Sequence, residues 1–136
     1  MVERMRIHDA LLGAYRRHLS GVLERRGIEV SGRVDRAIDR GEAWLAERLE
    51  ELARTPFHRQ RTGPLQLFQA AMRFPTDALH EEGHPPVRRD QVTVNALPGD
   101  VYDLAPASSR DLGDEVWAAH LEWGAAKAAA IGPPTH

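Results

Sequence analysis

The residues with the clearest potential for chemistry are two histidines and a glutamate beyond the middle of the chain. His80-Glu81-Glu82-Gly83-His84 fits the H-E-x-x-H pattern of zinc peptidases. On a helix, this spacing places both imidazoles on one side, where they bind the metal while the glutamate activates the metal-bound water. The motif therefore predicts a metal-dependent hydrolase in which His80 and His84 are ligands of a divalent metal and Glu81 is the catalytic base.

Two features within and after the motif argue for a simpler interpretation. Gly83 lies inside the motif, and Pro85 disfavours helical geometry at His84. A catalytic zinc site also needs a third protein ligand, and the spacing does not select one among the available residues, which include His58, Asp103 and His120. The alternative is a frayed helix end that carries exposed histidines and holds no cofactor.

Aromatic and polar residues toward the C-terminal end form a second candidate site. Trp117, His120 and Trp123 follow one another at intervals of three, and Tyr102 and Asp103 precede them. An imidazole between aromatic rings can bind a ligand or titrate near neutral pH. These five residues are candidates to line a small-molecule site, although packing of the two tryptophans is the favoured interpretation.

Composition excludes several other classes of protein. The chain contains no cysteine, which rules out disulfides, iron–sulfur clusters and thiol nucleophiles. It has no glycine-rich phosphate loop, G-x-S-x-G elbow or dinucleotide fingerprint. The net charge of −2 argues against a nucleic-acid-binding protein. The arginine pairs Arg16-Arg17 and Arg25-Arg26 are expected to lie on a solvated face.

No apolar run is long enough for a membrane helix, and the first residues lack the apolar core of a signal peptide. We therefore expect a cytoplasmic protein without membrane or nucleic-acid partners. The composition, in which arginine almost replaces lysine, is typical of a bacterial genome rich in G and C.

Hydrophobic periodicity predicts a helical hairpin at the start of the chain. Apolar residues recur at intervals of three and four in two stretches, 4–26 and 31–54, which indicates two amphipathic helices. The short link between them favours an antiparallel arrangement, with Ser31 as an N-cap. We expect His8 to be a buried core residue. The predicted stripes are Met5, His8, Leu12, Tyr15, Leu19 and Val22 in the first helix, and Val34, Ile38, Gly41, Leu45, Leu49 and Leu52 in the second.

The rest of the chain must cover this hairpin. Residues 64–82 predict a short buried helix that breaks at Phe74-Pro75. Residues 83–108 predict an irregular, proline-rich segment that contains, at most, a small β-hairpin. Residues 109–131 predict a last helix, with Ser108 and Asp111 spaced as a capping box. Its core-facing side is expected to hold Val116, Trp117, His120, Leu121, Gly124, Ala128 and Ile131, with Trp123 at the flank.

These elements predict one mainly α domain over residues 1–136, a helical bundle built on the N-terminal hairpin. Most aromatic residues lie between 57 and 124, beside the irregular segment. An aromatic patch with a polar rim suits a protein partner or self-association. The sequence thus favours a small protein-interaction or regulatory module, with a metal-dependent hydrolase and a small-molecule-binding module as alternatives.

Overall fold

The computed structural model describes residues 5–84 and 104–132 and confirms a mainly α-helical bundle. Its elements, in chain order, are α1 (Arg6–Arg25), α2 (Gly32–Ala53), the 3-10 turn η1 (Phe57–Arg59), α3 (Pro64–Ala71), α4 (Arg73–Glu81), the 3-10 turn η2 (Ser109–Leu112) and α5 (Asp114–Ile131). No strand occurs among the described residues. The β-hairpin expected within residues 92–104 falls almost entirely outside them.

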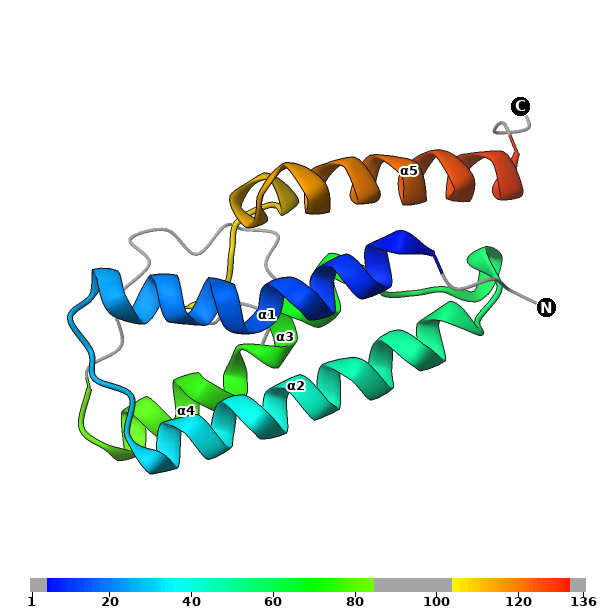
Figure 1. The fold of residues 1–136 in the computed structure, drawn as a ribbon. Helices are drawn as coiled ribbons and strands as arrows, with labels where there is room; N and C mark the ends of the chain where they lie inside the picture. Colours follow the sequence, from blue (N-terminus) through cyan, green and yellow to red (C-terminus); the bar gives the residue numbers. More distant parts are fainter. Residues whose placement is uncertain (1–4, 85–103, 133–136) are drawn as a thin grey trace, which may run out of the picture.

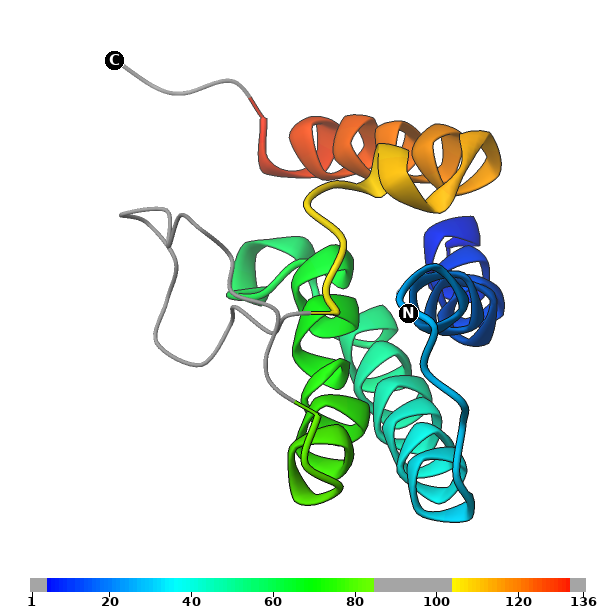
Figure 2. The same ribbon diagram turned by 90° about the vertical axis from the view of Figure 1, so that its left-hand side faces the viewer.

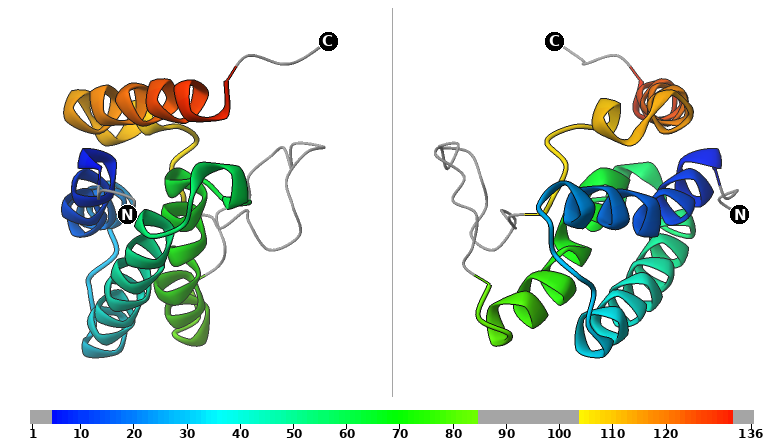
Figure 3. Two further views of the ribbon diagram at one scale, coloured as in Figure 1. Left: turned by 90° about the vertical axis from the view of Figure 1, so that its right-hand side faces the viewer. Right: turned by 60° about the vertical axis from the view of Figure 1, so that its left-hand side comes forward.

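The helices stack with α1 between α5 on one side and α2 on the other (Figure 1). α3 and α4 run back along α2 in the opposite direction; both pack against α2, and α3 also packs against α1. α1 and α5 run in opposite directions in Figure 1, and Figures 2 and 3 show that α5 crosses α1 at an angle, as an outer layer with other helices on one side only. None of the described helices is long and apolar enough to cross a lipid bilayer.

The hairpin buries the stripes that the sequence predicts, with small differences. All six predicted positions of α2 are buried, and α1 buries Tyr15, Leu19 and Val22 but leaves Leu12 only half-buried. His8 is 2% exposed, and its Nδ1 accepts a hydrogen bond from the backbone N–H of Met5 at 3.2 Å. The prediction of a buried core histidine is therefore confirmed.

Three helices meet at one buried contact around Tyr15. The Tyr15 hydroxyl donates to the carbonyl of Ala71 at 3.1 Å, which joins α1 to the end of α3. A Cβ atom at Gly41 would lie only 2.0 Å from that hydroxyl, so α2 can pass this point only with glycine. Burial raises the pKa of the Tyr15 phenol above its usual 10.0, which keeps the hydroxyl protonated and able to donate.

The break in the third helical segment lies at Met72, and the predicted break at Phe74-Pro75 is wrong. Pro75 lies in the first turn of α4, where a missing N–H leaves no helical hydrogen bond unmade. The carbonyl four residues before Pro75 belongs to Ala71, and it accepts the Tyr15 hydroxyl. α3 is also less enclosed than predicted, because Leu65 and Leu67 remain half-buried.

The orientation of the last helix differs from the prediction. α5 buries Val116, Ala119 and Trp123, whereas Leu121 is 52% exposed and Ile131 is 55% exposed. Most of the circumference of α5 is apolar, so its periodicity does not single out one face, and the contacts with α1 and η1 decide which face is buried. The helix also starts later than residue 109, because η2 and Gly113 come first.

Candidate functional site

The histidine motif straddles the end of α4. Gly83 adopts a left-handed conformation with φ +83°, and its N–H donates to the carbonyl of His80 at 3.0 Å. The N–H of His84 donates to the carbonyl of Leu79 at 3.0 Å. This is a Schellman helix end. His80 therefore lies in the last turn of α4 and His84 lies beyond it, so the helical placement that a zinc peptidase needs is not present.

The acidic residues of the motif make contacts with α2 and its N-cap. A carboxylate oxygen of Glu81 lies 3.5 Å from Arg33 Nη1, and Glu82 accepts a hydrogen bond from the Ser31 hydroxyl at 2.7 Å. Within residues 5–84 and 104–132, no three histidine, aspartate or glutamate side chains are grouped as metal ligands. Asp103 lies outside these residues, so the metal and the base role of Glu81 stay predictions.

The structure brings together three of the five residues predicted for the second site. Trp117 and His120 stack with their ring centroids 6.0 Å apart, and the rings of His120 and Trp123 are 5.8 Å apart. Arg110 lies 4.5 Å above the ring of Trp117 and Lys127 lies 5.1 Å above that of Trp123. The result is a row of three aromatic rings with a cation at each end. Tyr102 and Asp103 lie outside the described residues.

Two nitrogens in this row are buried without a hydrogen-bond partner in the described part of the chain. They are Nε1 of Trp123 and Nδ1 of His120. Trp123 also packs against Phe57 of η1, with ring centroids 6.4 Å apart. Leaving a buried polar group unpaired costs about 1–3 kcal/mol. The row thus combines core packing with unused hydrogen-bonding capacity.

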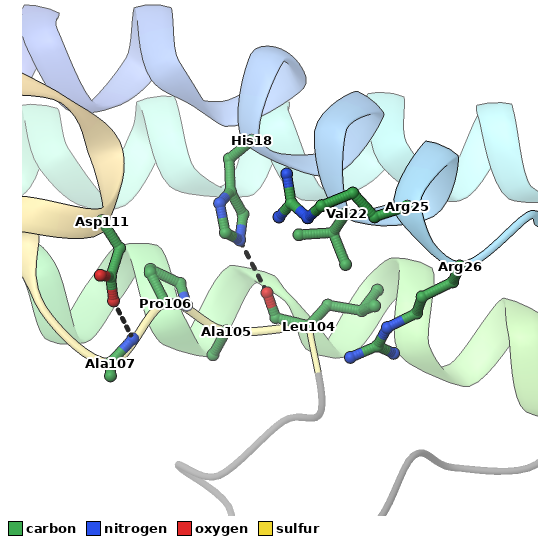
Figure 4. A pocket seen from close by; sticks show the side chains of 9 residues that line it. All are labelled: His18, Val22, Arg25, Arg26, Leu104, Ala105, Pro106, Ala107 and Asp111. Carbon is green, nitrogen blue, oxygen red and sulfur yellow. Dashed lines mark hydrogen bonds between the residues drawn. The ribbon is translucent and has the colours of Figure 1, made fainter.

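A groove that the sequence analysis did not identify lies between α1 and residues 104–112 (Figure 4). Its volume is about 440 Å³. A smaller hollow of about 140 Å³ adjoins it and shares His18, Arg25 and Asp111. The groove is lined by His18, Val22, Arg25 and Arg26 of α1 and by Leu104, Ala105, Pro106, Ala107 and Asp111.

His18 connects the two walls of this groove. Its Nε2–H donates to the carbonyl of Leu104 at 2.7 Å. The pKa of His18 is lowered from 6.5, mainly because burial disfavours the charged ring. Nearby Arg25 lowers this pKa further, whereas the bond to Leu104 and the charge of Asp111 oppose the shift. His18 is consequently neutral at neutral pH.

The positive charge at this place comes from Arg25 and Arg26, which line the groove, and from Arg17, which lines the adjoining hollow. Arg17 Nη2 donates to the carbonyl of Leu112 at 3.3 Å, and neither Arg17 nor Arg25 forms an ion pair with a described carboxylate. By contrast, Arg16 on the α2 side of the same helix pairs with Asp39 and Glu42.

The carboxylate in the groove is already engaged with the backbone. Oδ2 of Asp111 accepts the N–H groups of Ala107 at 3.0 Å and Ser108 at 3.2 Å. Asp111 thus makes its half of the predicted capping box, at the start of η2 rather than at the start of α5. Asp111 therefore offsets only part of the arginine charge.

The arginine pair at the end of α1 was expected on a solvated face; Arg25 is exposed and Arg26 is half-buried, and both also line this groove. The only sequence signal for this groove was the presence of arginines and a histidine near the end of the first helix. The opposite wall of the groove, however, begins about eighty residues later in the sequence, and no local pattern relates the two walls.

No protein-family model matches this chain, and comparison with curated proteins and with solved structures finds no similar protein.

Proposed function

We propose that this protein is a small protein-interaction module that associates with a second copy of itself through α5. The surface involved is the outer seam of α5, defined as Ala118, Leu121, Ala125 and Ala128. The observation that supports the proposal is the exposure of these side chains, with Leu121 52% exposed in the middle of the seam. Ile131 extends the apolar surface by almost one turn and is 55% exposed.

The spacing of the seam is that of helices that pair with one another. Its residues follow at intervals of three, four and three, as the a and d positions of a coiled coil do. Three of the four are alanine, which allows two helix axes to approach to the shorter end of about 8–10 Å. Leu121 then provides the large central side chain that packs against its counterpart.

The charges on α5 favour a second copy as the occupant. Glu122 is engaged with Arg6 at 3.0 Å, and Lys127 lies over the ring of Trp123. Neither belongs to the seam, which is free of charge from Ala118 to Ala128. A stripe without charge is best matched by another such stripe.

The acidic start of α5 decides the direction of the pair. A parallel pair would bring the two Asp114 carboxylates close to each other, at a cost in repulsion. An antiparallel pair centred on Leu121 separates them by about 20 Å at 1.5 Å per residue. It also aligns the helix dipoles favourably. We therefore expect an antiparallel dimer.

Sedimentation equilibrium over a wide range of protein concentration tests this proposal. The wild-type chain is expected to show a reversible monomer–dimer equilibrium, weak because one helix pair buries less than a standard interface of about 1,200–2,000 Å². Leu121→Lys places a charge in the centre of the seam and is expected to leave only monomer.

Val30→Lys is the matched control, because Val30 is also an exposed large apolar residue, at 47%, but lies in the link between α1 and α2. The control is expected to dimerise like the wild type. A wild-type protein that stays monomeric at all concentrations, or equal loss of dimer in both variants, would contradict self-association through α5.

A second candidate function is small-molecule binding at the row Trp117, His120 and Trp123. It is supported by the buried, unpartnered Trp123 Nε1 and His120 Nδ1, which a ligand could satisfy. Tryptophan fluorescence during a screen of small heteroaromatic compounds tests it. A saturable emission shift that His120→Leu abolishes supports binding, and unchanged emission with every compound leaves the row as packing alone.

A further inference from the structure

The geometry of the groove between α1 and residues 104–112 points to a binding site for a small organic anion that carries a phosphate or carboxylate group. This site is separate from the outer seam of α5, and the inference does not depend on self-association. Three features of the groove favour such a ligand: its charges, its dimensions and a glycine in the neighbouring turn of α1.

The charge balance favours an anionic ligand. Arg25 lines both the groove and the adjoining hollow, Arg17 lines the hollow, and neither forms an ion pair with a described carboxylate. One carboxylate oxygen of Asp111 already accepts hydrogen bonds from two backbone N–H groups. His18, which donates its Nε2–H to Leu104, carries no negative charge that could offset the arginines. A guanidinium group matches the two oxygens of a carboxylate or phosphate with parallel hydrogen bonds. A bound oxyanion would supply the negative charge that the described residues around Arg17 and Arg25 do not provide.

The size and the apolar wall favour an organic molecule over a bare inorganic ion. The groove has a volume of about 440 Å³, within the range of about 300–1,000 Å³ that is usual for small-molecule sites. Val22, Leu104 and Pro106 provide apolar surface along it. In Figure 4 the arginine side chains and this apolar surface face the same space. The charged group of the ligand would therefore bind the arginines while its carbon skeleton contacts the apolar wall.

Gly21 leaves space on α1 for the guanidinium group of Arg25. A Cβ atom at this position would lie 3.2 Å from Arg25 Nη1, so the guanidinium of Arg25 folds back along α1 over Gly21. Glycine weakens the interior of a helix relative to alanine. At position 21 it allows the Arg25 guanidinium to lie beside the hollow that Arg17 and His18 also line.

NMR titration of the ¹⁵N-labelled protein tests the site, with glycerol 3-phosphate and succinate as probes and sodium chloride at matched ionic strength as the reference. We expect saturable shifts of the amide signals of Gly21, Ala107 and Ser108 with at least one probe. Arg25→Gln is expected to weaken that binding about tenfold or more, since hydrogen bonds to charged groups are the stronger ones.

Arg40→Gln is the matched control, because it removes the same charge from an exposed position of α2 away from the groove. Unchanged binding in this variant, together with the loss in Arg25→Gln, supports the site, and the probe that binds more tightly identifies the preferred headgroup. Shifts no larger than those caused by sodium chloride would overturn the inference. So would equal weakening in the two variants, which would show a non-specific response to net charge.

Discussion

At the scale of single residues, the packing of Gly41 against Tyr15 is the tightest constraint in the described structure. The Tyr15 hydroxyl occupies the space that a side chain at position 41 would need, and the same hydroxyl donates to Ala71. Pro75, four residues after Ala71, has no N–H to donate, and the Tyr15 hydroxyl is the donor that this carbonyl at the end of α3 accepts. One phenol therefore holds three helices in place.

Gly41→Ala is expected to lower the free energy of unfolding by about 2–4 kcal/mol, since the added methyl group displaces the Tyr15 hydroxyl and leaves the Ala71 carbonyl unpaired. Urea denaturation followed by circular dichroism measures the change. Gly13→Ala is the control, because a Cβ there meets nothing within 4 Å; it should raise stability by up to about 1 kcal/mol. Similar stabilities of the two variants would show that the contact at Gly41 is not tight.

At the scale of the elements, the beginning of α2 and the end of α4 are joined through one side chain. The Ser31 hydroxyl oxygen accepts the N–H of Val34 at 3.1 Å, which caps α2, and the hydroxyl donates to Glu82 at 2.7 Å. The neighbouring Arg33–Glu81 pair is exposed and adds little. The cap is therefore the interaction that contributes most at this end of the bundle.

Ser31→Ala is expected to destabilise the protein by about 1 kcal/mol through loss of the cap. Ser20→Ala, at an exposed position inside α1, is the matched control and should be neutral or slightly stabilising, because alanine is the better helix former. Thermal denaturation of the two variants compares them directly. Equal melting temperatures would mean that α2 does not depend on Ser31.

At the scale of the whole molecule, α5 is attached to the bundle through a narrow buried stripe. Val116, Ala119 and Trp123 are its buried residues, and Trp123, the largest of them, packs against Phe57 of η1. The opposite side of the helix remains apolar and exposed, which is the basis of the proposed self-association. Most of the energy that holds α5 on the bundle should therefore depend on Trp123.

Trp123→Ala is expected to cost about 3–5 kcal/mol, the usual range for emptying a large buried aromatic site. Trp117→Ala should cost clearly less, because Trp117 is only half-buried and its main contacts are His120 and Arg110. Chemical denaturation of both variants measures the difference. A larger loss in Trp117→Ala would reverse the assignment of the core tryptophan.

In the histidine motif, local sequence signals predicted where a helix ends. Gly83 and Pro85 indicated a helix end within H-E-x-x-H, and α4 ends there with Gly83 in a left-handed conformation. The groove at His18 could not be predicted from local sequence signals. Its two walls come from α1 and from residues 104–112, and nothing in either segment specifies the other.

The sequence by itself determined the two long helices and their buried stripes, because polar and apolar residues alternate sharply enough there to leave one energetically acceptable face. It did not determine which face of α5 is buried, since a helix that is apolar around most of its surface gains similar free energy from several orientations. That choice depended on the shapes of α1 and η1 against which α5 packs. The juxtaposition of Arg17, His18 and Arg25 with Asp111 was likewise decided only in the folded chain, because it depends on contacts between segments that are distant in sequence.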